Sequence, residues 1–523
     1  MNELLRGGSR RRAHRGLWLS LIAGTVFRLV VVLHSSPEFN LPGMSFYGWP
    51  ADHGNYVQWG RQAASPDAGL LTVYTQPPDP GITVRLSFGE SFVHHGESEP
   101  ANYPPLGMYI IYLCGKIHRW LDPDIVANTA VARLVYQTAA LIGDIILALG
   151  VWRLVGLMLG RRAGGVAFHL VFWMPPIWLD SSWWGQTDSW IMAPAVWIVW
   201  ALATRRYGWA GVLWGLALAL KPQAILLAPV WVFCGVVRAA ARRHEGAPGS
   251  RADELLRWGS TLLVALAVVN IVALPFWFTS GDAWLQQSFL RNLRDEGPFT
   301  TLKAFNIWYV DLLLCYDANV HATLWGLEKD SWGKLLALAG LALCALIAWP
   351  RRTHRRQSLV VFAGLWLLAV VMLPTRVHER YLVMCLPFLI ALVPLVKRLR
   401  APLCGLLIVA TAQVLVYHWM PLSADAWTRK FRDAAIQYHE NVLAQTPPEL
   451  LDQVPTRTEA LALGKRAFIQ RHWQRTARWE WAVTILALAS AGGVFAALSS
   501  TRRPRRPAPA KTATLAIDTE TAR

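Results

Sequence analysis

Long apolar runs alternate with short basic clusters along most of the chain. Most runs have about the length that a helix needs to cross the hydrocarbon core of a membrane, and they contain few charges. This pattern predicts an all-α, polytopic membrane protein with about twelve transmembrane helices. The predicted spans are 16–34, 131–157, 165–180, 189–204, 207–220, 223–237, 258–278, 332–350, 357–374, 382–396, 402–420 and 478–499.

The basic clusters set the orientation, because Lys and Arg favour the cytoplasmic ends of spans. With both termini inside, every basic cluster lies inside, and the segments 35–130, 279–331 and 421–477 lie outside. The apolar run 103–121 would invert all later loops if it crossed the membrane. We therefore predict that it is an amphipathic helix in the outer interface.

Composition supports this interpretation. The chain has 523 residues, of which 54% are hydrophobic, and a net charge of +18. Because the basic residues lie at the ends of apolar runs, orientation in the membrane explains the charge and nucleic-acid binding is not indicated. The 28 Trp residues suit interfacial belts and sugar-stacking surfaces alike. Six scattered Cys residues without a CxxC pair indicate neither a zinc site nor a disulfide framework.

The segment Arg376–Tyr381 places two guanidinium groups, an imidazole and a carboxylate between two predicted spans. Charges at this boundary are costly unless they are paired or bind a ligand. Guanidinium binds phosphate oxygens in a bidentate manner, so Arg380 and His378 are candidate phosphate ligands. The alternative is a solvated turn.

A carboxylate follows the first predicted span at Asp52, where it could accept a proton from an attacking hydroxyl. The alternative role is the N-cap of the helix that the next residues predict. Between the third and fourth spans, Trp184, Gln186 and Asp188 lie in one tight outer loop. An aromatic face beside an amide and a carboxylate suits sugar binding, although Trp is also common in interfacial belts.

Further basic residues lie at the outer side. Lys221 separates the fifth and sixth spans and could bind phosphate or extend its amine toward the interface. Arg291 and Arg294 lie in the second long outer segment. Together, these residues place carboxylates, aromatics and cations at headgroup depth, which suits a phosphate-linked lipid substrate.

In this order along the chain, the motifs resemble those of the GT-C glycosyltransferases. They look most like the polyprenyl- or dolichyl-phosphate-sugar-dependent glucosyltransferases and mannosyltransferases of lipid-linked oligosaccharide assembly. The matching pieces are Asp52, Asn102–Leu106, Pro123, Arg133, Asp144, Trp184–Asp188, Lys221–Gln223, Phe289–Trp308 and Val377–Arg380. Two positions depart from the eukaryotic pattern, which has Asp at Asn102 and Lys at Arg380.

The resemblance implies the GT-C fold over 16–420, preceded by a basic cytoplasmic N-terminus, 1–15. It is followed by the outer segment 421–477, a last span at 478–499 and a disordered basic cytoplasmic tail, 500–523. The fold implies interfacial helices in the outer loop 35–130 and a second outer loop, 279–331.

The resemblance also implies an activity: inverting transfer of a hexose from a polyprenyl-monophosphate sugar to an acceptor hydroxyl, without metal or other cofactor. Asp52 would be the general base. The donor phosphate would be bound by Arg380, His378, Lys221, Arg291 and Arg294. The sugar or acceptor would be bound by Trp184, Gln186, Asp188, Tyr103 and Glu379. The acceptor would be a glycan, a lipid-linked glycan or a protein at the outer face. High Arg and Ala usage and the basic tail look bacterial, so we expect a bacterial plasma membrane.

Two other classes stay open. A transporter with twelve spans is one, although we find no internal repeat of the kind that such carriers contain. An oligosaccharide polymerase or ligase is the other, and its donors would be polyprenyl diphosphates.

Overall fold

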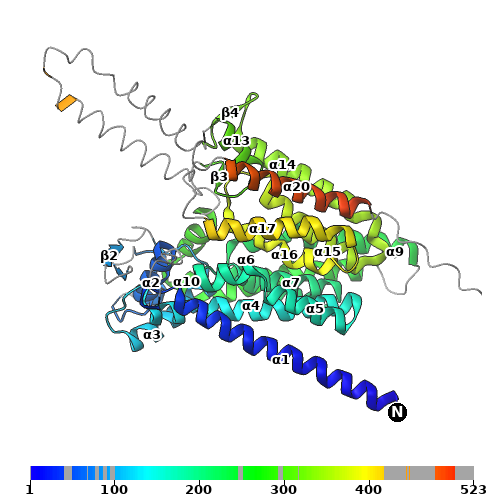
Figure 1. Cartoon of the computed structure of the whole chain (residues 1–523), viewed down its shortest axis with the longest axis horizontal. Helices are drawn as coiled ribbons and strands as arrows, with labels where there is room; N and C mark the ends of the chain where they lie inside the picture. The colour runs from blue at the N-terminus through cyan, green and yellow to red at the C-terminus, as the bar shows by residue number, and fades with distance from the viewer. Residues whose placement is uncertain are drawn as a thin grey trace, which may run out of the picture.

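The computed structural model is a bundle of helices whose long axes run in similar directions (Figure 1). It describes residues 2–39, 50–67, 69–76, 82–85, 91–94, 100–245, 251–291, 299–315, 317, 319–416, 443–444, 447 and 478–500. The predictions for 421–477 and for the tail therefore fall almost entirely outside the described residues.

The described helices are α1 Asn2–His34, α2 Pro50–Ala63, α3 Pro105–Leu121, α4 Ala130–Leu159, α5 Arg161–Phe172, α6 Pro175–Trp178, α7 Ser189–Ala203, α8 Tyr207–Leu220, α9 Ala228–Glu245, α10 Arg251–Ser280, α11 Ala283–Leu285, α13 Ile307–Cys315, α14 Lys329–Ala348, α15 Arg355–Met372, α16 Leu386–Leu392, α17 Arg400–Val416 and α20 Arg478–Ser500. Short helical turns connect some of them, notably η4 Leu179–Trp184, η5 Pro222–Leu227, η7 Trp349–His354 and η8 Glu379–Met384.

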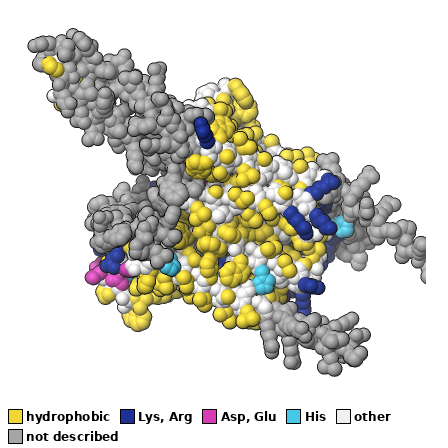
Figure 2. Space-filling model, viewed as in Figure 1, with side chains coloured by type: hydrophobic (Ala, Val, Ile, Leu, Met, Phe, Trp, Pro, Cys, Tyr) yellow, Lys and Arg dark blue, Asp and Glu magenta, His cyan; other side chains and the backbone are white. Residues whose placement is uncertain are grey.

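Among the described residues, eight helices are long and apolar enough to cross a membrane, and α7 and α8 are shorter apolar helices. On the face drawn in Figure 2, hydrophobic side chains cover much of the body of the bundle. The all-α, polytopic class is therefore confirmed, while the number of twelve spans stays a prediction. α15 lies at the centre, with every side chain from Ser358 to Met372 buried. Its Phe362 ring stacks on Phe233 of α9 with 4.1 Å between centroids.

Two predicted spans are broken, and proline explains both. The span 165–180 is divided between α5 and α6, because Pro175 and Pro176 lack the N–H groups that a continuous helix needs. The span 382–396 contains only the short α16, which begins beside Pro387 and ends before Pro394. The preceding residues form the turn η8 instead.

Buried polar contacts fix α1 to the bundle. Arg28 on α1 pairs with Asp144 on α4 at 3.0 Å, and both side chains are at most 1% exposed. Ser181 in η4 donates to the same carboxylate at 2.6 Å. Removing one partner of such a buried pair costs about 3–5 kcal/mol, because the other charge is left uncompensated.

The predicted helix over 103–121 is present as α3, which packs against α2. At their crossing, a Cβ on Gly115 would lie 2.1 Å from the carbonyl oxygen of Gly60, so only glycine allows this approach. The other face of α3 exposes Leu113 and Trp120. This apolar face fits the predicted position in the outer interface.

Three short strand pairs complete the described structure. β1 Ile82–Arg85 pairs antiparallel with β2 Ser91–His94, and β4 Thr323–Leu324 pairs with β5 Leu327–Glu328. β3 Thr301–Leu302 pairs in parallel with β6 Val377–His378. The last pair joins the second outer segment to the Arg376–Tyr381 motif.

Candidate active site

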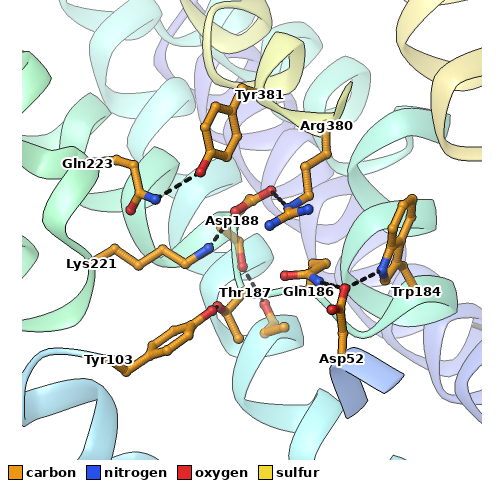
Figure 3. Close-up of polar contacts among 12 residues, drawn as sticks. Asp52, Tyr103, Trp184, Gln186, Thr187, Asp188, Lys221, Gln223, Arg380 and Tyr381 are labelled. Carbon is orange, nitrogen blue, oxygen red and sulfur yellow. Dashed lines mark hydrogen bonds and ion pairs between the residues drawn. The ribbon is translucent and has the colours of Figure 1, made fainter. Parts of the chain in front are cut away.

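At the end of the bundle that carries α2 and α3, polar side chains from four separate segments converge (Figures 1 and 3). Asp52 comes from the first turn of α2, and Gln186 and Asp188 come from the loop after η4. Lys221 lies between α8 and η5, and Arg380 lies in η8. Segments more than three hundred residues apart in sequence therefore share one cluster.

Asp52 faces the loop after η4 and does not cap its own helix. Its Oδ2 accepts hydrogen bonds from Nε1 of Trp184 at 3.1 Å and from Nε2 of Gln186 at 2.5 Å. α2 begins two residues earlier, at Pro50, so the N-cap alternative is wrong. Burial raises the pKa of Asp52 above its usual value, and Arg380 and the Trp184 hydrogen bond offset only part of this. A carboxylate with a raised pKa is a stronger base.

The corner that presents Trp184 and Gln186 requires a glycine. Gly185 has φ 89°, and a Cβ there would lie 2.6 Å from the side-chain amide of Gln137. The backbone N–H groups of residues 185 and 186 both donate to the Asp180 carbonyl, at 3.1 and 2.9 Å. The corner is therefore fixed by its own backbone, which holds both donors of the Asp52 carboxylate in place.

A chain of ion pairs forms the centre of the cluster. Lys221 donates from Nζ to Asp188, and Nε of Arg380 lies 3.2 Å from Oδ2 of Asp188. A terminal nitrogen of Arg380 donates to Oε1 of Glu379 at 3.0 Å. Burial by itself would raise the pKa of Asp188, but Lys221 and Arg380 hold that pKa below its usual range. The carboxylate is thus ionised, and it fixes two cations side by side.

The remaining charged residues of the motif have different partners. His378 contacts Glu379, with 3.8 Å between Nδ1 and Oε2. Glu379 forms an ion pair with Arg380, whereas Arg376 pairs with Asp330 of α14 at 3.4 Å. Arg376 therefore anchors the start of the motif to α14.

Tyrosines line the side of the cluster opposite η8. The hydroxyl of Tyr103 lies 3.1 Å from Oγ1 of Thr187 and 2.8 Å from the hydroxyl of Tyr56. Tyr56 donates in turn to Oε1 of Gln186 at 3.1 Å. Nζ of Lys221 lies 5.7 Å from the centre of the Tyr103 ring. This wall joins the carboxylate side of the cluster to its cationic side.

Comparison with known proteins agrees with this arrangement. Residues 82–293 match the model of the ALG6, ALG8 glycosyltransferase family, and this segment contributes Tyr103, Trp184, Gln186, Asp188 and Lys221. The match covers less than half of the chain, and over this segment the chain is similar to that glycosyltransferase family. The long apolar helices among the described residues indicate an integral membrane protein.

Solved structures of two GT-C proteins are similar to the chain at low identity. The apo oligosaccharyltransferase of Archaeoglobus fulgidus has 13% identity and a TM-score of 0.34, over 92% of this chain and 56% of that one. The chain thus spans little more than half of the length of the archaeal protein. Apo ArnT from Cupriavidus metallidurans has 14% identity and a TM-score of 0.37, over 93% of this chain and 77% of that one. No curated protein matches the chain.

Two residues that the sequence analysis predicted as donor ligands, Arg291 and Arg294, are not part of the cluster described above. Arg291 directly follows the helical turn η6 Gln286–Leu290, and one of its terminal nitrogens donates to Oε1 of Gln287 at 3.4 Å. Arg294 lies outside the described residues. The roles of both in phosphate binding stay predictions. Within the described part of the chain, no group of three or more His, Cys, Asp and Glu could hold a metal ion.

The sequence analysis did not identify Tyr56 and Gln413, which contact residues of the candidate site. Tyr56 lies four residues after Asp52, on the same face of a helix, and this spacing could have indicated it. Gln413 on α17 is 2% exposed. With its amide oriented to satisfy both groups, it donates to the Glu379 carbonyl at 3.1 Å and accepts from the Phe305 N–H at 2.8 Å. Its sequence surroundings carry no signal for this role.

Proposed function

We propose that this protein transfers a hexose from a polyprenyl-monophosphate sugar to an acceptor hydroxyl, with inversion at the anomeric carbon. One observation carries the proposal: a carboxylate with a raised pKa, Asp52, shares a cluster with two fixed cations, Lys221 and Arg380. A base and an anion-binding pair in one cluster are what such a displacement needs.

The reaction would proceed in one step. The acceptor oxygen forms a bond to the anomeric carbon while its proton passes to Asp52. The bond between that carbon and the phosphate oxygen breaks, and the electron pair leaves with the polyprenyl phosphate. The phosphate gains a negative charge in this step. Cations that are already in place lower the barrier, because they need no reorganisation when this charge develops.

Arg380 is the better placed of the two cations to follow the leaving phosphate. Its guanidinium pairs with both Asp188 and Glu379, which fix its orientation. The same guanidinium is near enough to Asp52 to lower the pKa of that carboxyl. Lys221 would act as a second point charge. Gln186 and Trp184 would orient the base and contact the sugar or the acceptor, together with Asp188, Tyr103 and Glu379.

A small apolar cavity lies beside the cluster. Its volume is about 10 Å³, the room for one water molecule, and its walls include Met192, Leu226, Leu367 and Met384. Gln223 also lines it and donates to the hydroxyl of Tyr381, the residue after Arg380.

Transfer assays with matched donors test the proposal. Purified protein would be given one hexose on a short polyprenyl monophosphate or on the corresponding diphosphate, with lipid-linked glycans and hydroxyl-bearing peptides as acceptors. We expect transfer from the monophosphate with inversion. Transfer from the diphosphate alone would instead identify a polymerase or ligase. Sugar uptake into vesicles that contain neither donor lipid would identify a transporter.

A further inference from the structure

Asp188 lies between the two cations that are proposed to bind the donor phosphate (Figure 3). Its Oδ1 accepts a hydrogen bond from Nζ of Lys221, and its Oδ2 lies 3.2 Å from Nε of Arg380. A carboxylate that contacts two cations through its two oxygens takes positions that phosphate oxygens would also need. Asp188 therefore competes with a phosphate for the same guanidinium.

The contact between Asp188 and Arg380 is the weaker of the two. Although they are 3.2 Å apart, neither Nε of Arg380 nor Oδ2 of Asp188 makes a hydrogen bond among the described residues. Charge alone holds this pair, whereas guanidinium binds anions most strongly through directed hydrogen bonds. A phosphate oxygen aligned with this N–H would gain a hydrogen bond that Asp188 does not make. Glu379 would keep the guanidinium oriented through its own contact with a terminal nitrogen at 3.0 Å.

The cluster is most exposed on the side of β6 and η8. The His378 side chain is 30% exposed and that of Arg380 is 14% exposed, whereas those of Lys221 and Asp188 are 5% and 2% exposed. A ligand that enters from outside would thus reach Arg380 before Asp188. The Arg380 end of the ion-pair chain is therefore where a phosphate would replace the carboxylate.

A second buried acid, Asp180 of η4, offers a partner for the displaced carboxylate. Asp180 is 1% exposed, and neither of its carboxyl oxygens has a hydrogen-bond partner among the described residues. Burial and the nearby Asp188 charge hold the pKa of Asp180 well above its usual range, so this carboxyl carries a proton. A protonated carboxyl donates a hydrogen bond, which a buried Oδ2 of Asp188 would need once it has lost its cation.

We propose that the donor phosphate takes the place of Asp188 on Arg380, and that Asp180 then donates a hydrogen bond to the released Asp188 carboxylate. This inference rests on the proposed function, because it takes the donor phosphate as the ligand of Arg380. The alternative is that Asp188 stays in place and positions Arg380 for a phosphate that binds its other nitrogens. Removal of the Asp188 charge would tighten phosphate binding in the first case and weaken it in the second.

Isothermal titration of the full-length protein in a neutral detergent tests the proposal. The ligand is a short polyprenyl methyl phosphate, a phosphodiester that carries no sugar, so that binding is measured without transfer. We expect Asp188→Asn to bind it about tenfold more tightly, since this variant removes a competing charge. Asp330→Asn is the matched control, because Asp330 pairs with Arg376 of the same motif, and it should bind as the unmodified protein does. Equal or weaker binding by Asp188→Asn, or equal tightening by Asp330→Asn, would overturn the proposal.

Substitutions of Asp180 test the second step while Asp188 stays in place. Asp180→Asn retains a hydrogen-bond donor, whereas Asp180→Leu has none. We expect Asp180→Leu to bind about tenfold more weakly and Asp180→Asn to bind almost as the unmodified protein does. In the Asp188→Asn background, Asp180→Leu should have no effect, because no displaced carboxylate remains. Equal weakening by both Asp180 variants, or the same loss in both backgrounds, would show a structural role and overturn the proposal.

The same titrations separate this inference from the proposed function. If the unmodified protein binds the phosphodiester and transfers sugar, but Asp188→Asn binds no more tightly, the inference alone is overturned. If neither protein binds the phosphodiester, the phosphate site at Arg380 is wrong and both proposals are overturned.

Discussion

At the scale of the residue, Asp52 is defined by its two hydrogen-bond donors, Trp184 and Gln186. They orient the carboxylate, while Arg380 forms its ion pairs with Asp188 and Glu379. A carboxylate that was neutralised by a close guanidinium would be a weaker base. Under the proposed function, this arrangement would keep the base separate from the phosphate ligand.

Asp52→Asn keeps the shape of the side chain and removes the basic oxygen. We expect turnover to fall by roughly 10²–10⁴-fold, the usual contribution of a general base, with donor-lipid binding retained. Steady-state kinetics and a donor-binding assay measure the two effects. Asp67→Asn is the control, because Asp67 is an exposed acid in the same outer segment. Near-normal turnover of Asp52→Asn would assign the base elsewhere.

The raised pKa of Asp52 predicts a pH profile. Burial raises this pKa, so kcat/KM should fall on acidification at a higher pH than an ordinary aspartate would give. The Trp184 hydrogen bond lowers the pKa of Asp52, and Trp184→Phe should therefore move this acid limb to still higher pH. Trp183→Phe serves as the control. An acid limb that Trp184→Phe leaves unchanged would argue that another group titrates.

Arg380 contacts two carboxylates at once, which a lysine cannot reproduce. Arg380→Lys should raise KM for the donor about tenfold or more and change KM for the acceptor little. Arg376→Lys is the matched control, since Arg376 belongs to the same motif but pairs with Asp330. Varying donor and acceptor separately distinguishes the two constants. An effect of Arg380→Lys on the acceptor alone would make this residue an acceptor ligand.

At the scale of the element, the β3–β6 pair and Gln413 hold the motif in place. The parallel register aligns Thr301 with Val377 and Leu302 with His378. The N–H of Arg376 donates to the Thr300 carbonyl at 3.0 Å. So short a strand pair contributes little by itself, and the Gln413 amide connects the same two segments from the side of α17.

Gln413→Leu should therefore loosen the motif. It leaves the Phe305 N–H and the Glu379 carbonyl without their bridge, and each unsatisfied buried group costs about 1–3 kcal/mol. We expect a lower unfolding temperature and a higher KM for the donor. Gln286→Leu, which removes an exposed contact with Asp282, should change neither. A variant with normal donor KM would show that β3–β6 holds the motif without Gln413.

At the scale of the whole molecule, the cluster lies at the end of the bundle that carries α2 and α3 (Figure 1). If basic clusters mark the inside, this end faces outward. The outer position of the transfer reaction therefore depends on the predicted topology.

Cysteine labelling tests that topology. In a background with the exposed Cys315 and Cys404 replaced, Asp67→Cys should react with an impermeant maleimide in intact cells. Arg161→Cys, at the exposed turn between α4 and α5, should react only after permeabilisation. The reverse pattern would invert the topology and place the cluster inside.

The sequence by itself determined the class of the fold and the ends of most helices. The predicted spans 189–204 and 207–220 correspond to α7 and α8, and 478–499 to α20. Such segments are specified locally, by length, apolar content and charged ends, and therefore need no knowledge of their neighbours. The ordered motifs likewise indicated which residues to consider, and the resemblance to glycosyltransferases agrees with the family match over residues 82–293.

Only the tertiary structure decided which of these residues meet. Asp52 contacts Trp184 and Gln186 across more than a hundred residues, Arg376 pairs with Asp330 and not with Glu379, and Gln413 bridges two loops. These partners depend on which helices lie side by side, and that outcome is set by packing many side chains at once. A pattern along one segment reports the face that will be buried, but the packed bundle alone determines what lies against it.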